Sequence, residues 1–127
     1  MGYYGKSNDK QPVSMKIDGS INTIIEQLPG SNSFLSMRMI SWNDAQPRLD
    51  IRRWYTDSQG NENPGKGFSF ATESGPNNLA VALVQNGYGE TTQILNNIKN
   101  REDFEESLNE ILGKTNKTLY DPKSILV

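Results

Sequence analysis

The sequence contains no cysteine and no histidine among its 127 residues. Without cysteine, the chain cannot form disulfides or a zinc site built on thiolates. Without histidine, it lacks the commonest general base and every nucleophile pair that combines cysteine with histidine. These absences exclude most zinc enzymes and much acid–base catalysis at neutral pH, so we expect no metal and no cofactor.

Long apolar segments are also missing. No stretch approaches the ~18 apolar residues of a membrane span, and residues 1–11 are polar, which predicts a flexible arm rather than a signal peptide. We therefore expect no membrane contact and a cytoplasmic or otherwise intracellular location. Hydrophobic residues make up 34% of the chain, fewer than is usual for a globular domain. The core must be small, and a homodimer would share additional apolar surface.

No nucleophile can be paired with a base in this sequence, so we expect a protein that is not an enzyme. Residues 60–67 resemble a phosphate-binding loop, but Gly67 occupies the position where serine or threonine must hold magnesium. A hairpin loop that presents Lys66 is the simpler interpretation.

Charge is distributed unevenly along the chain. The net charge is −2, but residues 101–112 carry one arginine and five acids, a net of −4, so the remainder sums to +2. Two tryptophans and five basic residues lie together in the central stretch, the basic residues being Arg38, Arg48, Arg52, Arg53 and Lys66. A local basic and aromatic surface is compatible with nucleic-acid binding despite the overall charge.

Hydrophobic periodicity predicts an α+β domain. Alternation predicts strands over 34–42 and 48–55, a polar loop over 57–65 and a returning strand over 67–70. Residues 13–28 begin as a strand and continue as either a strand or a short helix. Helical spacing follows over 77–85, 91–98 and 101–112, with Asn100 as a cap and with Gly87 and Gly113 as stops. We expect one domain over 12–113, with its sheet over about 12–71 and its helices over about 76–113, and a tail over 114–127.

The strand over 48–55 has two different sides. Arg48, Asp50, Arg52 and Trp54 project one way, whereas Leu49, Ile51, Arg53 and Tyr55 project the other way. We expect the side with the guanidinium groups and the indole rings to be open to solvent. Asp50 would then orient Arg48 or Arg52, and Arg53 would either contact the ligand or pair with a carboxylate. Phe68 and Phe70 are expected in the core.

The central stretch also carries a family resemblance. It reads Ile-Ser-Trp-Asn-Asp-Ala-Gln-Pro-Arg-Leu-Asp-Ile-Arg-Arg-Trp-Tyr over 40–55 and Pro-Gly-Lys-Gly-Phe-Ser-Phe over 64–70. This resembles the positive cofactor four family of transcriptional coactivators, and more closely its bacterial YdbC-like branch, over about residues 34–86. The resemblance implies a strongly curved sheet of four antiparallel strands followed by a helix, with two copies paired into a saddle that accepts single-stranded DNA. By position, Arg52, an aromatic at Trp54 or Tyr55, and Lys66 match the family's contact residues.

The predicted function is sequence-independent binding of single-stranded DNA, or alternatively RNA, in replication, recombination, repair or transcription. Aromatic rings stack on unpaired bases, and nearby cations neutralise phosphates. The candidate contact residues are Arg38, Trp42, Arg48, Arg52, Arg53, Trp54, Tyr55 and Lys66, with Trp42 and Arg48 matched to the family only approximately. The alternative is a dimeric structural or regulatory module that binds a protein through its C-terminal helices or tail.

Overall fold

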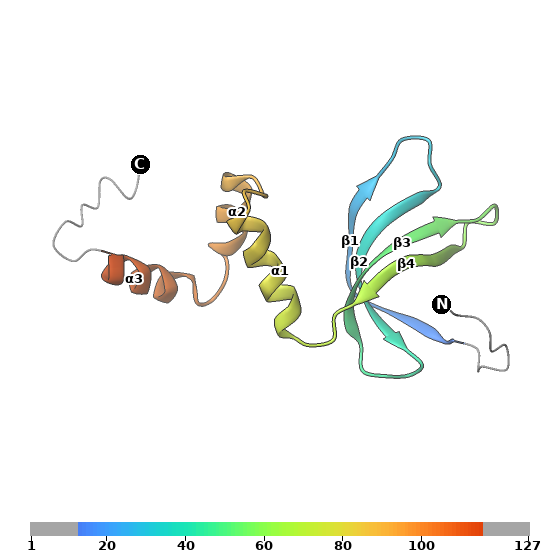
Figure 1. The fold of residues 1–127 in the computed structure, drawn as a ribbon, viewed down its shortest axis with the longest axis horizontal. Helices are drawn as coiled ribbons and strands as arrows, with labels where there is room; N and C mark the ends of the chain where they lie inside the picture. Colours follow the sequence, from blue (N-terminus) through green and yellow to red (C-terminus); the bar gives the residue numbers. More distant parts are fainter. Residues whose placement is uncertain (1–12, 116–127) are drawn as a thin grey trace. The chain divides into compact units, whose positions relative to one another are not determined.

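The predicted α+β class is confirmed in a computed structural model of the protein, which describes residues 13–115. Within that range, four strands precede three helices (Figure 1). They are β1 (Met15–Gln27), β2 (Ser33–Trp42), β3 (Arg48–Thr56), β4 (Glu62–Ser69), α1 (Ser74–Gln85), α2 (Thr91–Ile98) and α3 (Phe104–Thr115). The predicted N-terminal arm, and all of the predicted tail beyond residue 115, lie outside the described residues.

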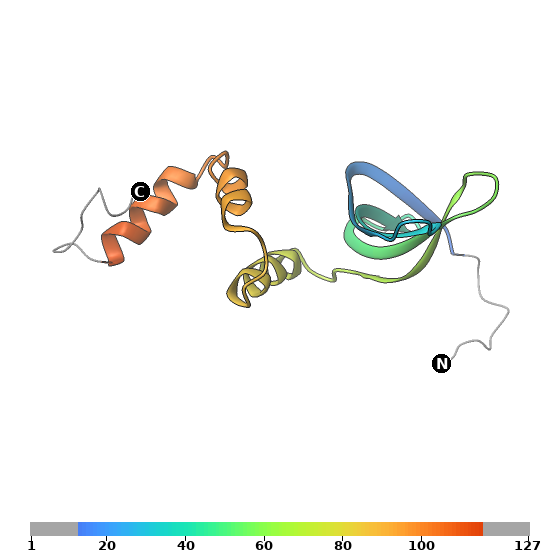
Figure 2. The same cartoon turned by 90° about the horizontal axis from the view of Figure 1, so that it is seen from above.

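The chain divides into two compact units, Met1–Ala80 and Val81–Val127, and the division falls within α1. The first unit contains the sheet. Its strands are antiparallel and lie in the order β1-β2-β3-β4, so each strand pairs with its neighbour in sequence. Irregular pairing interrupts β1 between Ile17 and Asn22, and it interrupts β3–β4 pairing between Arg52 and Trp54. Such bulges bend and twist a sheet, and Figure 2 shows the resulting strong curvature.

The strand register assigns the side chains of the sheet to two faces. We call the side on which Phe34 lies beside Trp54, and Arg38 beside Asp50, the inner face. The opposite side is the outer face, where Met37 lies beside Ile51 and Ile51 beside Phe68. Burial alternates along β2 between these faces, with every second residue from Phe34 to Ile40 buried. The predicted two-residue alternation of β2 and β3 is therefore confirmed.

The hydrophobic core lies on the inner face and is small. Among the described residues it consists of Phe34, Ile40 and Trp54, with Met15 and Trp42 packed against it. The curvature of the sheet encloses these side chains, so a single layer of strands buries a core without a second layer. Large apolar residues elsewhere in the described chain are consequently left partly exposed.

Several element boundaries differ from the sequence prediction. The ambiguous part of residues 13–28 is a strand, since β1 continues to Gln27. Strand β4 begins at Glu62, inside the segment predicted as a loop, and ends before Phe70. Helix α3 begins at Phe104 rather than after Asn100, and it continues past Gly113 to Thr115.

Helix α2 matches its predicted range of 91–98, and the reason lies in its first turn. Glu90 precedes the helix in an extended conformation, and its carboxylate accepts hydrogen bonds from the backbone amides of Thr92 and Gln93. These bonds satisfy donors that the start of a helix leaves unpaired. Among the described residues, no helix is both long enough and apolar enough to cross a bilayer.

Candidate nucleic-acid interface

The predicted open face of the sheet is the buried one, and this corrects the prediction for Trp54 and Arg38. Trp54 is 0% exposed and Arg38 is 4% exposed. The Arg38 guanidinium carbon lies 4.4 Å from the centre of the Trp54 ring and 5.5 Å from that of Phe34. The guanidinium therefore stacks on the indole of its own chain, and within this fold the Trp54 ring is closed to a nucleic-acid base.

Polar partners explain how Arg38 is accommodated in the interior. Its Nη2 donates a hydrogen bond of 2.7 Å to the carboxylate of Glu62, and its Nε donates one of 3.2 Å to the side chain of Asn22. Burial of a charge is costly unless the charge is paired and hydrogen-bonded. Two buried donors, Arg38 Nη1 and Trp54 Nε1, have no acceptor among the described residues.

A second polar network ties Arg52 and Trp42 to the fully buried Asp50. Arg52 donates from Nε and Nη2 to the two carboxylate oxygens, at 3.1 and 3.0 Å. Ser69 donates to Asp50 at 2.6 Å and accepts from the indole Nε1 of Trp42 at 3.0 Å. The Arg52 guanidinium also lies over the half-buried Trp42 ring. Asp50 was predicted to orient Arg48 or Arg52, and in the structure it binds Arg52.

Tyr55 is the exposed aromatic of β3, with 43% of its surface open. It lies on the outer face and crosses Gly65 of the neighbouring strand. A Cβ atom at Gly65 would approach the Tyr55 ring to 2.5 Å, so the absence of a side chain at residue 65 makes room for the ring. Lys66, the next residue, is exposed as well.

Arg53 lies beside Tyr55 on the outer face and is partly exposed. Its Nη2 donates to the carboxylate of Glu26 on β1 at 3.0 Å, with side-chain exposures of 30% and 61%. Of the two roles predicted for Arg53, contact with the ligand or pairing with a carboxylate, the structure shows the pairing. Because an exposed ion pair of this kind contributes only about 0–1 kcal/mol, a phosphate could compete with Glu26 for Arg53.

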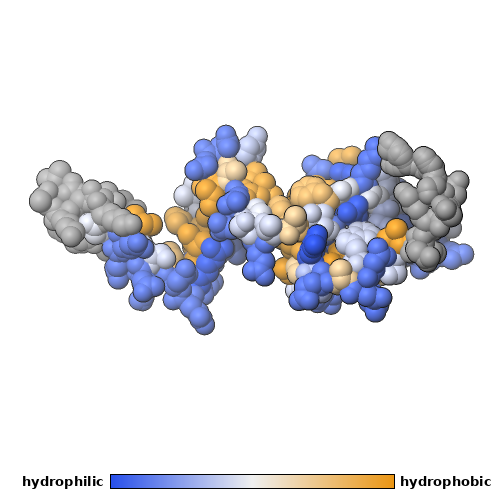
Figure 3. Space-filling view, turned by 60° about the horizontal axis from the view of Figure 1, so that its bottom comes forward, coloured by the Kyte–Doolittle hydropathy of each residue, from blue (hydrophilic) through white to orange (hydrophobic). Residues whose placement is uncertain are grey.

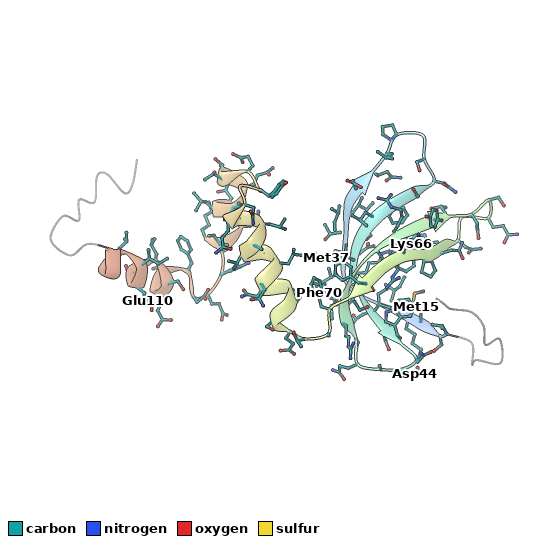
Figure 4. The ribbon with its side chains drawn as sticks, viewed as in Figure 1. Met15, Met37, Asp44, Lys66, Phe70 and Glu110 are labelled. Atoms are coloured by element: carbon teal, nitrogen blue, oxygen red, sulfur yellow. The ribbon has the colours of Figure 1, made fainter. Side chains whose placement is uncertain are left out.

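The outer face also carries phenylalanines that the sequence assigned to the core. Phe68 is 50% exposed, so its predicted burial is wrong, whereas Phe70 is half-buried. The two rings meet edge to face with their centres 5.2 Å apart. Figure 4 shows Met37 and Phe70 on the same side of the sheet, and Figure 3 shows hydrophobic residues gathered in surface patches.

Two cations of the sheet are free to meet phosphates. Lys16, Arg38, Arg52 and Arg53 each pair with a carboxylate. Arg48 and Lys66 are exposed and form no ion pair with any residue in the described range. They are therefore the predicted site residues best suited to contribute phosphate contacts.

The turn between β3 and β4 holds Tyr55 and Lys66 in register. Asp57 accepts backbone hydrogen bonds of 2.9 Å from Asn61 and from Gln59, and one of 3.3 Å from the Asn63 side chain. These bonds, with that from the Asn61 amide the largest cause, hold the pKa of Asp57 below its ordinary value. Asn63 in turn pairs with Tyr55 across the two strands.

Comparison of the chain with protein-family models, curated proteins and solved structures finds no match. The resemblance to the positive cofactor four family thus stays a prediction made on the sequence motifs.

Proposed function

We propose that the protein binds single-stranded nucleic acid on the outer face of its sheet, without enzymatic activity. DNA is the first candidate and RNA the alternative. The observation that carries this proposal is the exposed Tyr55 ring, which lies over Gly65. Arg53 is two residues before Tyr55 on β3, and Lys66 follows Gly65 on β4. The ring is thus an exposed aromatic surface with cations near it.

Stacking and charge together favour a single strand over a duplex. Stacking of a base on an aromatic side chain contributes about 1–3 kcal/mol and tolerates any base. A duplex keeps its bases stacked inside, so it offers Tyr55 only its backbone. Phosphate contacts by Lys66 would add affinity that weakens as salt increases. Arg48 shares the inner-face side with Ile40, so it would add such a contact only from the exposed start of β3.

The motif resemblance leaves two residues for the family's aromatic contact, Trp54 and Tyr55. Burial favours Tyr55, because Trp54 is covered by Arg38 whereas Tyr55 is open. The four-stranded antiparallel sheet followed by a helix, which the resemblance implies, is present, and it supports the proposal at the level of the fold. The absence of histidine and cysteine supports a binding role over a catalytic one.

We also propose a homodimer as the active form. The inner-face core contains three buried hydrophobic residues within the described range, which is little for a chain of 127 residues. Helices α1 and α2 have no buried residue. A second copy of the chain would cover apolar surface that the single chain leaves open.

The test is a fluorescence anisotropy titration of labelled oligonucleotides with the full chain, at several salt concentrations. Tyr55→Ala should weaken binding of single strands roughly 5- to 150-fold, the range that corresponds to about 1–3 kcal/mol. Tyr88→Ala is the matched control, since Tyr88 is 65% exposed and lies in the other unit, and it should leave affinity unchanged.

Lys66→Ala tests the electrostatic part of the proposal. It should weaken binding to every sequence alike and lower the slope of affinity against salt by about one phosphate contact. Lys99→Ala, which removes an exposed lysine from the other unit, should have little effect. Equal affinity for single strands and duplex, or no binding to either, would refute the proposed function.

A second candidate function is protein binding through the helical unit. Val81, Leu95 and Ile111 are 48%, 53% and 59% exposed, and α3 has acidic residues in its first turn. An apolar and acidic surface suits a basic protein partner. A pull-down should compare the full chain with a chain truncated after Gly113. A partner held by the helices stays bound to the truncated chain, whereas one held by residues 114–127 is lost.

A further inference from the structure

A cavity of about 350 Å³ lies within the first unit at the other end of β3 from Tyr55. It is formed where β3 begins, where the chain leaves β4 and where α1 starts. Its lining includes Met39 and Leu49 from the sheet and Phe70 from the segment after β4. These residues are half-buried, so the cavity has an apolar floor that is continuous with the outer face.

Polar and charged side chains also line this cavity. Gln46 and Thr72 offer hydrogen-bonding groups, and Glu73 offers a carboxylate. Arg48, which forms no ion pair with the described residues, lines it too. Apolar walls with a few polar groups are the usual composition of a small-molecule site. Apolar surface, a cation and hydrogen-bonding groups together match a nucleotide better than they match an aliphatic side chain, which has no charge and no hydrogen-bonding group.

The size and position of the cavity fit one nucleotide of a bound strand. Its volume lies at the lower end of the ~300–1,000 Å³ range of small-ligand sites. Residues 49 and 55 are six positions apart on β3, which corresponds to about 20 Å at ~3.3 Å per residue. A strand stacked on Tyr55 could therefore reach the cavity within a few nucleotides along the outer face.

We propose that this cavity receives one unstacked base of the bound strand and prefers cytosine or adenine, which carry an amino group where thymine carries its O4 carbonyl oxygen. The proposal rests on the function proposed above and adds a base preference to it. Glu73 can accept a hydrogen bond from the amino group of cytosine or adenine, whereas the only N–H of the thymine ring lies between two carbonyl oxygens that the carboxylate repels, and Gln46 can pair with adenine. Arg48 would hold the adjoining phosphate. Base selection would thus come from the cavity, and general affinity from Tyr55 and Lys66.

The experiment uses the full chain and a set of short thymine oligonucleotides in which a single thymine is replaced in turn by cytosine or adenine. At the favoured position, either replacement should tighten binding about fivefold or more relative to the all-thymine strand. Glu73→Gln should abolish this ratio of affinities between the substituted and the all-thymine strand. The neutral amide of glutamine does not repel the carbonyl oxygens of thymine. Glu102→Gln, a matched change of an exposed acid in the other unit, should leave the ratio intact.

Arg48→Ala should weaken binding of all strands and reduce the salt dependence, without removing the base preference. Three results would overturn the cavity proposal alone: equal affinity for every base at every position, an unchanged ratio in Glu73→Gln, or a change in solution mass in both cavity variants, which would indicate that a second copy occupies the cavity. Failure to bind any single strand would overturn the proposed function together with the cavity.

Discussion

Two adjacent aromatic residues on β3 have opposite environments. Trp54 is 0% exposed beneath the guanidinium of Arg38, whereas Tyr55 is 43% exposed above Gly65. Consecutive side chains of a strand point to opposite faces, so Trp54 lies on the inner face and Tyr55 on the outer face. Trp54 contributes to stability, and Tyr55 is available for binding. Mutations at these two positions should therefore have different consequences even though the residues are neighbours.

The buried carboxylate of Asp50 gives a prediction about stability. Asp50→Asn keeps the side-chain volume but removes the charge that pairs with Arg52, which is 15% exposed. Loss of one partner of a buried pair leaves the other uncompensated, and we expect the free energy of unfolding to fall by about 3 kcal/mol. Urea denaturation measures this change. Asp44→Asn is the control, because Asp44 and Lys16 are 75% and 76% exposed and such a pair contributes about 0–1 kcal/mol.

Asp57 gives a prediction about pH. Its pKa is lowered in the folded chain, chiefly by the hydrogen bond from the Asn61 amide. A lowered pKa stabilises the fold above the ordinary aspartate value of 3.8, and this contribution is lost as the pH falls through the folded value. NMR should show the amide signals of Gln59 and Asn61 shifting together at a pH below 3.8. Shifts centred above that value would contradict the assignment, and Asp57→Ala should remove them.

At the scale of elements, the alternation of β2 and β3 could be predicted from the sequence, but the identity of the buried face could not. Met37 and Ile51 are more hydrophobic than Arg38 and Asp50, so hydrophobicity alone assigns the outer face to the core. The inner face is buried instead because Arg38 pairs with Glu62 and Asp50 with Arg52. Glu62 lies in the part of β4 that was predicted as a loop, so this pairing was not visible before the fold was known.

Strand β4 was predicted too short for a related reason. Pro64 and Gly65 are unfavourable in strands, which made residues 57–65 look like a loop. In the fold, β4 is an edge strand with a pairing irregularity opposite residues 52–54, and such a strand tolerates proline. Gly65 accommodates the Tyr55 ring. Gly65, which helps to hide the strand in the sequence, therefore also makes room for the candidate binding ring.

Gly67 gives a prediction about strand pairing. A Cβ atom there would collide with the Ile51 carbonyl and would lie 2.5 Å from the Arg52 Cα, and backbone atoms cannot move aside easily. We expect Gly67→Ala to lower the free energy of unfolding by about 1–3 kcal/mol. Gly113→Ala is the control, because nothing lies within 4 Å of its Cβ position and alanine favours a helix by up to about 1 kcal/mol. Circular dichroism during urea denaturation would measure the change in the free energy of unfolding, which should be negative for Gly67→Ala and positive for Gly113→Ala. No change for Gly67→Ala would contradict the close packing of β3 on β4.

At the scale of the whole molecule, the two units differ in how they are stabilised. The sheet unit has a buried inner face with both apolar and ionic contacts. Helices α1 and α2 have no buried residue. Helices of 12 and 8 residues are marginal in water unless their apolar side is covered. This exposure is the reason for the proposal that a second copy of the chain covers these helices.

Self-association is thus the last prediction, and helix α1 is where it can be tested. Val81 and Val84 lie one turn apart and are 48% and 52% exposed. If a second copy covers them, sedimentation equilibrium should give twice the chain mass of 14.2 kDa. Val84→Asp should then shift the protein towards monomer and reduce the helical signal, because a charge cannot be buried there without a partner. Asn78→Asp adds the same charge at an exposed position of the helix and should leave the mass unchanged. A stable monomer with intact helices would show that α1 needs no second copy.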